Sequence, residues 1–377
     1  MNGVTKPLRA GWVKCKLGDQ LMLQRGFDLT QKQCFPGDYP VISSGGTSAF
    51  HNEFKAEGPG VLLGRKGSVG AVHYVEMNYW PHDTTLWVKD FKGNHPRFIY
   101  YFFRWFPISQ FEASTANPTL NRNRLHPVEV LWPPLEEQRR IAAILDKADA
   151  VRQKRKEAIA LTEELLRSAF LEMFGNPVTN PKGWKIQSFE EVCERIFKGA
   201  FDLKASLYQS SGVPFIRISD IQDGTIDLSK SVFISEKALA SYTQYSVVPG
   251  DLVFSKVGTI DRIGIVPPSI STAVISQNNV GAKLKREIMK PAFALAYLTT
   301  DYSLARIRAT SKKAVQDKLV LSELRGLSIP VPPLEYQDQF FKVQESVSTT
   351  QQRIQQSSVH SDNLFNSLLQ RAFRGEL

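Results

Sequence analysis

Two long stretches of the chain carry apolar residues at the three- and four-residue spacing of an amphipathic helix. Each stretch covers about 40 residues, which predicts a helix about 60 Å long. Because helices of that length cannot bury an apolar stripe alone, we expect the two to pair in a coiled coil. The apolar positions of the first are Ile141, Ile144, Leu145, Ala148, Val151, Ala158, Ile159, Leu165, Leu166, Ala169 and Met173, and those of the second are Phe340, Val343, Val347, Ile354, Leu364 and Leu368.

Both helices open on almost the same six residues. Residues 133–138 read PPLEEQ and residues 332–337 read PPLEYQ. A match of five positions in six arises by chance about once per million aligned pairs at average residue usage. Pro134 suits the first position of a helix, while Gly175 and Gly375 supply the glycine that commonly ends one. The chain therefore contains one helix plan twice.

Shorter matches precede the two boxes and keep the same order in both halves. The separation between matched residues only rises, from 172 to 199, whereas chance matches would scatter. This indicates an internal pseudo-repeat, with an insertion in the second copy around residues 223–249, where Asp223-Gly224 signals a turn. The matches are residues 11–12 with 183–184, 27–29 with 201–203, 40–42 with 214–216, 67–68 with 258–259 and 96–98 with 291–293.

Between the helices the pattern is that of mixed globular regions. Short apolar runs bounded by Gly, Pro or Asp predict strands at residues 41–42, 61–63, 85–88 and 252–254. Residues 97–105 and 292–305 read as helices. We therefore predict an α+β fold in which two globular mixed α/β domains are separated by two long helices. The expected segments are a first domain at 1–132, a helix at 133–175, a second domain at 176–331 and a helix at 332–377.

Charge and cysteine usage narrow the class of protein. Lys and Arg outnumber Asp and Glu by 47 to 37, giving a net charge of +10, which suits a polyanionic partner such as nucleic acid although many basic proteins bind none. Cys15, Cys34 and Cys193 show no metal or disulfide spacing, so a reducing cytosol fits. No apolar run is long enough to cross a membrane, and the first residues lack a signal-peptide core. A soluble cytoplasmic protein is expected.

On the two boxes, the Gly-Trp pairs at residues 11–12 and 183–184, and the Gly67-Ser68 block, the chain resembles the specificity (S) subunit of Type I restriction–modification systems. The resemblance implies two target-recognition domains, each reading one half of a bipartite double-stranded DNA sequence. It also implies that the helices form an antiparallel coiled-coil spacer that docks two modification (methyltransferase) subunits, with restriction (helicase–nuclease) subunits completing the complex. The chain would then be no enzyme and hold no cofactor, with S-adenosylmethionine, ATP and Mg on partner chains.

The absence of several catalytic motifs from the sequence agrees with the expectation that the enzymatic activities belong to partner chains. It carries no G-x-x-x-x-G-K-[ST] phosphate loop. None of its Asn-Pro pairs continues as the Asn-Pro-Pro-aromatic box of a methyltransferase resembling the expected partner. Its six histidines form no metal-ligand spacing. Two other interpretations stay open, a stand-alone sequence-specific DNA-binding regulator and a coiled-coil scaffold whose basic charge is incidental.

The first candidate contact with DNA is a glycine-flanked turn. Arg65 and Lys66 place two cations beside Gly67 and Ser68, where backbone can approach a phosphate or a base edge. The competing interpretation is a solvated surface turn. We favour DNA contact because Lys256 recurs at the position of Arg65.

The second candidate is the polar loop at residues 115–124. Its amides and guanidiniums suit adenine and guanine edges respectively, although a loop capped by its own Asn side chains explains them too. The corresponding residues 310–316 are also basic and polar. The residues predicted to contact DNA here are Asn117, Asn121, Arg122, Arg124, Lys312 and Lys313.

For other charged residues the sequence gives weaker grounds to predict contact with DNA. Arg217 and Arg262 are predicted readers in the second domain on position and charge alone. For His82 a structural hydrogen bond with Asp83 is favoured over DNA contact. The basic run at residues 152–156 is interpreted as a solvated helix face, with contact to the DNA spacer as the minority interpretation.

The boxes themselves are candidates for subunit docking. Glu136 and Gln138 in the first box, and Glu335 and Gln337 in the second, lie in the first helical turn, where ordinary capping is the alternative. The second helix has four more residues than the first between its box and its Ala-Phe pair. A helix pair that sets the spacing of two half-sites would act as a ruler.

Overall fold

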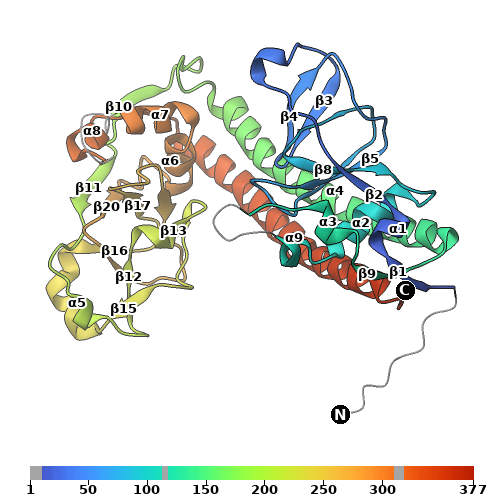
Figure 1. Ribbon diagram of the computed structural model, residues 1–377. Helices are drawn as coiled ribbons and strands as arrows, with labels where there is room; N and C mark the ends of the chain where they lie inside the picture. The colour runs from blue at the N-terminus through green and yellow to red at the C-terminus, as the bar shows by residue number, and fades with distance from the viewer. Residues whose placement is uncertain (1–10, 113–117, 310–317) are drawn as a thin grey trace. The chain divides into compact units, whose positions relative to one another are not determined.

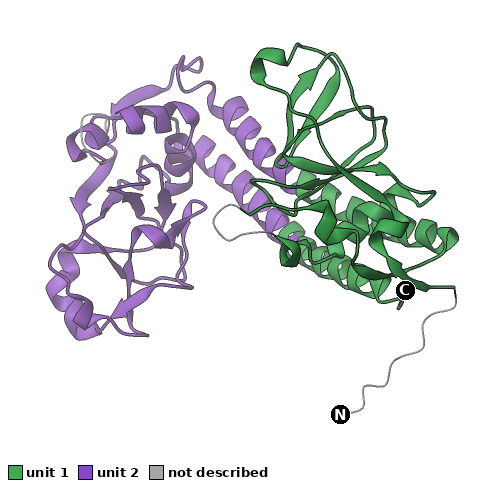
Figure 2. Ribbon diagram, in the orientation of Figure 1, with its two compact units in different colours: residues 1–158, 354–377 green, residues 159–353 purple. Residues whose placement is uncertain are grey.

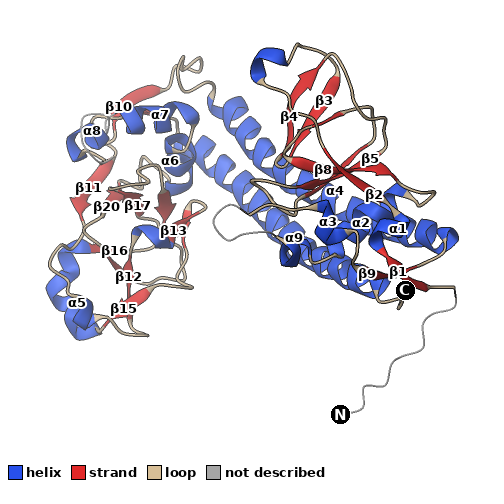
Figure 3. Cartoon of the chain, in the orientation of Figure 1, coloured by secondary structure: helices blue, strands red, loops and turns tan. Residues whose placement is uncertain are grey.

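The computed structural model describes residues 11–112, 118–309 and 318–377 of the chain (Figure 1). In these ranges no helix has the length and apolar character needed to span a membrane. The chain divides into unit 1, residues 1–158 and 354–377, and unit 2, residues 159–353 (Figure 2). Both units contain helices and strands, and runs of consecutive strands such as β3 (Tyr39–Ser43) to β8 (Thr85–Asp90) are followed by helices (Figure 3), so the predicted α+β class is confirmed.

Unit 1 is built on two sheets and a short strand pair. A four-stranded sheet runs in the order β2-β8-β5-β6, a three-stranded sheet in the order β4-β3-β7, and β1 pairs with β9. The strands are β1 (Val13–Lys16), β2 (Met22–Arg25), β3 (Tyr39–Ser43), β4 (Gly46–His51), β5 (Gly60–Gly64), β6 (Val72–Val75), β7 (Trp80–Pro81), β8 (Thr85–Asp90) and β9 (Glu129–Trp132), and the short helices are α1 (Leu17–Gln20), α2 (Pro96–Trp105) and α3 (Arg122–Leu125).

Unit 2 has a larger six-stranded sheet, β11-β20-β17-β18-β14-β13, a four-stranded sheet, β15-β12-β19-β16, and the pair β10 with β21. Its strands are β10 (Lys185–Ser188), β11 (Cys193–Lys198), β12 (Val213–Ile216), β13 (Ile221–Gln222), β14 (Thr225–Ile226), β15 (Val232–Ile234), β16 (Ser246–Val247), β17 (Leu252–Ser255), β18 (Ile263–Ile265), β19 (Ala273–Ile275), β20 (Asn279–Leu284) and β21 (Ser328–Val331), and its short helices are α5 (Glu236–Tyr242), α6 (Pro291–Leu298), α7 (Asp301–Ala309) and α8 (Leu321–Arg325).

The two units repeat one topology. The order β2-β8-β5-β6 in unit 1 corresponds to β11-β20-β17-β18 in unit 2, and a parallel strand pair follows in each, β3 with β7 and β12 with β19. The predicted pseudo-repeat is thus seen in the strand pairing. The predicted insertion is present as well: β13 and β14 form a hairpin at Asp223 and Gly224, which have φ of 48° and 76°.

The long helices are α4 (Leu135–Phe174) and α9 (Leu334–Phe373), each of 40 residues. They begin one residue after Pro134 and its counterpart, and the glycines at 175 and 375 follow them with φ of 82° and 71°. The prediction that Pro134 is the first helical residue is therefore wrong by one position, which lies within the ordinary spread of helix boundaries.

Within each unit the two long helices run antiparallel. In unit 1 the Arg140 guanidinium donates to the Leu377 carbonyl at 2.8 Å, and Arg155 donates to the Ser357 carbonyl at 2.7 Å. In unit 2 the Phe340 ring centroid lies 5.6 Å from that of Phe170 near the other end of α4. The predicted antiparallel pairing is confirmed.

Several positions of the expected apolar stripe are exposed, and a polar residue takes the inward position at Arg152. Val151, Leu165 and Leu364 were expected in the buried stripe, yet their side chains are 45%, 57% and 58% exposed. Arg152 lies inward instead, 2.7 Å from the Asp149 carboxylate and 2.6 Å from that of Asp362 on α9. The interpretation of residues 152–156 as a solvated face is thus wrong for Arg152 and for Arg155, because both reach across to α9.

One predicted helix is interrupted. Residues 292–305 were expected to form a single helix, but α6 ends at Leu298 and α7 starts at Asp301. The Thr300 hydroxyl accepts a hydrogen bond from the Ser303 amide at 3.3 Å and donates to the Tyr297 carbonyl at 2.7 Å. Thr300 therefore caps α7 and closes α6, a role in which Thr is common.

Candidate nucleic-acid interface

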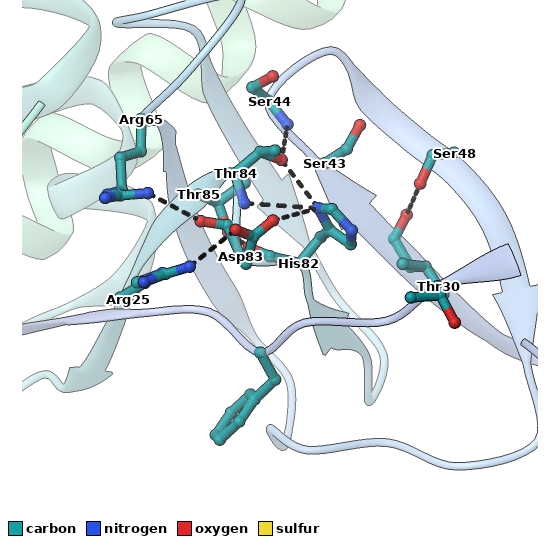
Figure 4. Close-up of polar contacts among 12 residues, drawn as sticks. Arg25, Thr30, Ser43, Ser44, Ser48, Arg65, His82, Asp83, Thr84 and Thr85 are labelled. Carbon is teal, nitrogen blue, oxygen red and sulfur yellow. Dashed lines mark hydrogen bonds and ion pairs between the residues drawn. The ribbon is translucent and has the colours of Figure 1, made fainter. Parts of the chain in front are cut away.

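In unit 1 the end of β2, the loop after β5 and the turn before β8 come together (Figure 4). The Arg65 amide donates to the Thr84 carbonyl at 2.7 Å, and its guanidinium donates to the Asp83 carbonyl at 3.4 Å. The Arg25 guanidinium, at the end of β2, lies 2.9 Å from the Asp83 carboxylate. Two cations, one at the end of β2 and one directly after β5, thus flank one tight turn.

Unit 2 contains the same arrangement with different side chains. The Lys256 amide donates to the Asn278 carbonyl at 2.7 Å, and its ammonium donates to the Gln277 carbonyl at 3.1 Å. Lys198 ends β11 as Arg25 ends β2. The sequence predicts that Lys256 occupies the position of Arg65. The structure confirms this, because the backbone amide and the side chain of each residue donate hydrogen bonds to equivalent carbonyls.

The turn is held against the neighbouring strand by a close backbone approach. A Cβ on Gly26 would lie 2.1 Å from the His82 carbonyl oxygen, and one on Gly199 would lie 2.0 Å from the Ser276 carbonyl oxygen. Only glycine fits at either position. This glycine pair was not predicted from the sequence, although both glycines directly follow the terminal cation of their strand.

The loop between the two sheet strands also repeats its backbone. Gly67 and Gly258 have φ of 75° and 76°, a left-handed conformation that glycine adopts without strain. Lys66 and Ser68 are exposed on this loop in unit 1. The predicted glycine-flanked turn is therefore present, and its two cations differ in surroundings: Arg65 is half-buried against the turn while Lys66 extends into solvent.

Three ammonium groups gather in unit 2. Lys198, Lys256 and Lys318 line a cleft of about 370 Å³, and none of them forms an ion pair with a described residue. Burial, followed by the charges of Lys318 and Lys198, lowers the pKa of Lys256. The three ammonium groups repel one another, and no carboxylate among the described residues pairs with them. An anion that enters the cleft relieves this repulsion, so the cleft suits a phosphate group.

The counterpart in unit 1 carries less positive charge. Burial and Arg25 lower the pKa of Arg65, while Asp83 opposes the shift. Leu120 and Leu319 donate equivalent hydrogen bonds to the Arg65 and Lys256 carbonyls, at 3.0 and 2.8 Å. The residue before each leucine is therefore also equivalent, and Thr119 stands where unit 2 has Lys318.

His82 forms the structural contact that the sequence favours. Its Nδ1 lies 3.2 Å from the Asp83 carboxylate and 3.0 Å from the Thr84 hydroxyl. Ligand atoms of Asp28, His82 and Asp83 lie within 4.8 Å of one another. Because Asp83 already pairs with Arg25, we interpret this group as a hydrogen-bonded turn and assign it no metal.

The described side chains of the polar loop before α4 bond to the protein backbone, within the loop and outside it. The Asn121 side chain accepts from the Asn123 amide and caps α3, as the alternative interpretation expected. The Arg122 guanidinium donates to the Leu23 carbonyl at 3.5 Å, and that of Arg124 to the Glu112 carbonyl at 2.9 Å. Both arginines remain exposed. Three of the predicted contacts, Asn117, Lys312 and Lys313, lie outside the described residues.

The two predicted arginine readers of unit 2 lie in different places. Arg217 lines a cleft of about 310 Å³ together with Gln277 and Asn278, and its guanidinium lies 3.4 Å from the Asp220 carboxylate. Arg262 donates to the Ile218 carbonyl at 3.4 Å and lines a separate cleft. The structure thus brings Arg217, but not Arg262, to the turn that holds Lys256.

The box glutamines have a structural role. Gln138 accepts a hydrogen bond from the His95 amide at 2.9 Å and donates to the Pro133 carbonyl at 3.0 Å. Gln337 accepts from the Lys290 amide at 2.7 Å and donates to the Pro332 carbonyl at 2.7 Å.

Each glutamine therefore fastens the start of a long helix to the residues that precede α2 or α6. Gln138 is 2% exposed and Gln337 0%, so their amides are not accessible to a partner as the docking prediction required. Glu136 and Glu335, beside them, are exposed.

Comparison with known proteins identifies the family. Residues 10–161 and 181–358 match the family described as Type I restriction modification DNA specificity domain. The chain belongs to this family. The predicted resemblance to specificity subunits is thereby confirmed.

The specificity subunits that match this chain are distant from it in sequence. The specificity subunit of the type I restriction enzyme EcoBI from Escherichia coli is 25% identical over 309 residues, which cover 72% of this chain and 63% of that protein. The MjaIX specificity subunit from Methanocaldococcus jannaschii is 24% identical, covering 63% of this chain and 58% of the relative. The matched segments thus span less than two thirds of these relatives.

Solved structures share the fold over almost the whole chain. The S subunit of a type I restriction–modification system from M. genitalium has a TM-score of 0.62 at 14% identity, covering 98% of both chains. A chain from a structure on complex assembly and conformational transition of a type I R-M system has a TM-score of 0.58 at 20% identity, covering 99% of this chain and 100% of that one.

Proposed function

We propose that this chain is the non-catalytic DNA-recognition subunit of a Type I restriction–modification complex, reading one half of a bipartite target with each unit. The observation that carries the proposal is the repeated frame of a cation and a tight turn. Arg65 and Lys256 are held by equivalent bonds, while the turn residues differ between units. A common frame suits phosphate contacts, which carry no sequence information, and different side chains suit two unlike half-sites.

Methylation and cleavage belong to partner chains in this proposal. S-adenosylmethionine, ATP and Mg would be bound by two methyltransferase subunits and by helicase–nuclease subunits in the cytoplasm. The pseudo-repeat supplies two similar docking surfaces, which suits two copies of one partner. Glu136 and Glu335, in the first turn of α4 and α9, are among the exposed box residues that such a partner would contact.

The test is the methylation pattern of cells that express this chain with a Type I methyltransferase subunit from the same genome. We expect methylated adenines in one bipartite sequence with a fixed number of unspecified base pairs between its halves. Cells that express the methyltransferase alone are the control and should lack that pattern. Sequence-specific binding by the chain alone, with no methylation in either culture, would instead identify a stand-alone regulator.

A deletion in α9 tests whether the helices set the half-site separation. Removing four residues within 348–358 shortens a helix by about 6 Å, or about two base pairs of DNA. The methylated sequence is expected to keep both half-sites and change only its spacer. Replacing the same four residues by alanine, which keeps the helix length, should leave the spacer as it was, and an unchanged spacer in the deletion variant would refute the ruler hypothesis.

A further inference from the structure

The turn between the two sheets differs between the units in what its side chains can do. In unit 1 the Asp83 carboxylate is shared between Arg25 and His82, at 2.9 and 3.2 Å. The Thr84 hydroxyl accepts from the Ser44 amide at 3.2 Å. Figure 4 shows this network, in which the Asp83 and Thr84 side chains both bond to other residues of the protein.

In unit 2 the equivalent positions are Gln277 and Asn278, and both are exposed. Their backbone carbonyls hold Lys256, at 3.1 and 2.7 Å. Their side-chain amides, by contrast, have no hydrogen-bond partner in the part of the chain that the structure describes. The backbone of the turn is fixed while two amides remain free to bind a ligand, which is the requirement for a specific reader.

The surroundings of these amides suit a base pair. Gln277 and Asn278 line a cleft of about 310 Å³ with Arg217 and Phe201, and the Phe201 side chain is 70% exposed. An Asn or Gln amide pairs with the N6 and N7 atoms of adenine, and an aromatic side chain contacts the methyl group of thymine. The two contacts together are specific for an A·T pair read in the major groove.

The neighbouring lysines complete the arrangement. Lys256 donates to the Gln277 carbonyl and lines the second cleft with Lys198 and Lys318. A backbone phosphate held by those ammonium groups would place the adjoining base edges beside the turn. Affinity and specificity are thus assigned to adjacent but separate side chains.

We propose that Gln277 and Asn278 are specificity-determining residues that read an A·T pair in the half-site of unit 2. This inference rests on the proposed function, because it names the readers within a recognition unit. It also accounts for the difference between the two half-sites. In the same turn of unit 1, the Asp83 and Thr84 side chains bond to Arg25, His82 and Ser44 and are not available to DNA.

The test compares Gln277→Ala, Asn278→Ala and the double variant with the unaltered chain, each in complex with its methyltransferase subunit. Methylation and binding are measured on a library of duplexes randomised at every position of both half-sites. We expect the preference for A·T to fall about 5- to 150-fold at one or two positions of one half-site. The other half-site, and the dependence of affinity on salt, should not change.

Gln277→Glu is the sharper substitution. A carboxylate of the same shape accepts hydrogen bonds but cannot donate to adenine N7, and it suits the exocyclic amine of cytosine. We expect the preference at the contacted position to move from A·T toward C·G. The variant also keeps the backbone carbonyl that holds Lys256, so loss of the turn would not explain the change.

Lys318→Ala is the matched control, because it lies in the lysine cleft and carries no amide. It should weaken binding to all sequences alike and reduce the salt dependence by about one ion. If Gln277 and Asn278 variants keep the complete base preference, or lose affinity uniformly as Lys318→Ala does, the inference is wrong. If the unaltered complex itself shows no base preference, the proposed function fails.

Discussion

Replacing Lys198, Lys256 and Lys318 together by alanine is expected to lower the affinity for duplex DNA about 100-fold at about 0.2 M salt. The three ammonium groups line one cleft and form no ion pair with a described residue. Each phosphate contact contributes about 0.9 to the slope of log K against log salt. The slope should therefore fall by about 2.7, as measured by fluorescence anisotropy across a salt series.

A matched set of substitutions separates local contact from net charge. Lys182, Lys185 and Lys237 are also exposed in unit 2 and lie outside the lysine cleft. Their joint replacement by alanine removes the same charge, yet it should change the slope far less because long-range effects are screened beyond about 10 Å. Equal losses in the two triple variants would show that only net charge matters and that the cleft holds no phosphate.

The parts of the fold that follow from the sequence are those fixed by local residue choice. The PPLE boxes, the terminal glycines and the turn at Asp223-Gly224 each constrain a few adjacent residues, and each occurs where expected. The order of the matches further predicted that Arg65 and Lys256 occupy the same position. That prediction succeeded because the same left-handed backbone conformation occurs at residues 67 and 258, and this conformation favours glycine in both units.

The parts that do not follow depend on contacts between distant residues. Arg152 reads as a polar position, but a long guanidinium with two carboxylate partners can occupy the interior of a helix pair. Hydrophobic periodicity therefore predicts that Val151 is buried and Arg152 exposed, whereas Val151 is exposed and Arg152 faces α9. Likewise, Gln138 and Gln337 look like surface residues of a first helical turn, and only the fold brings the His95 and Lys290 amides to them.

The candidate site divides in the same way. Cations beside glycine were predicted from the sequence because charge and turn chemistry are local properties. Gln277 and Asn278 were missed, since two amides in a short turn form no motif. Their position became informative only when the unit-1 turn showed its equivalents, Asp83 and Thr84, engaged in internal hydrogen bonds.

Gln337→Ala is expected to reduce the free energy of unfolding of unit 2 by about 3 kcal/mol. The substitution leaves the Lys290 amide and the Pro332 and Ile288 carbonyls without their side-chain partner, and each buried polar group left unpaired costs about 1–3 kcal/mol. It also opens a cavity at a position that is 0% exposed. Urea unfolding would measure the loss, and hydrogen exchange at the Lys290 amide would locate it.

Three further variants distinguish this role from partner docking. Gln138→Ala should cost unit 1 a similar amount, because the same bonds to His95 and Pro133 are lost. Glu335→Ala, on the exposed side of the same turn, should leave stability within about 0.5 kcal/mol. Gln337→Glu keeps the acceptor for the Lys290 amide but loses both donated bonds, so it should remain destabilised. Since the box glutamines fasten each long helix to the residues that precede α2 or α6, their loss should also loosen the angle between the helix and the rest of its unit. A Gln337→Ala chain that keeps full stability yet fails to bind the proposed methyltransferase partner would instead assign the glutamine to the docking surface.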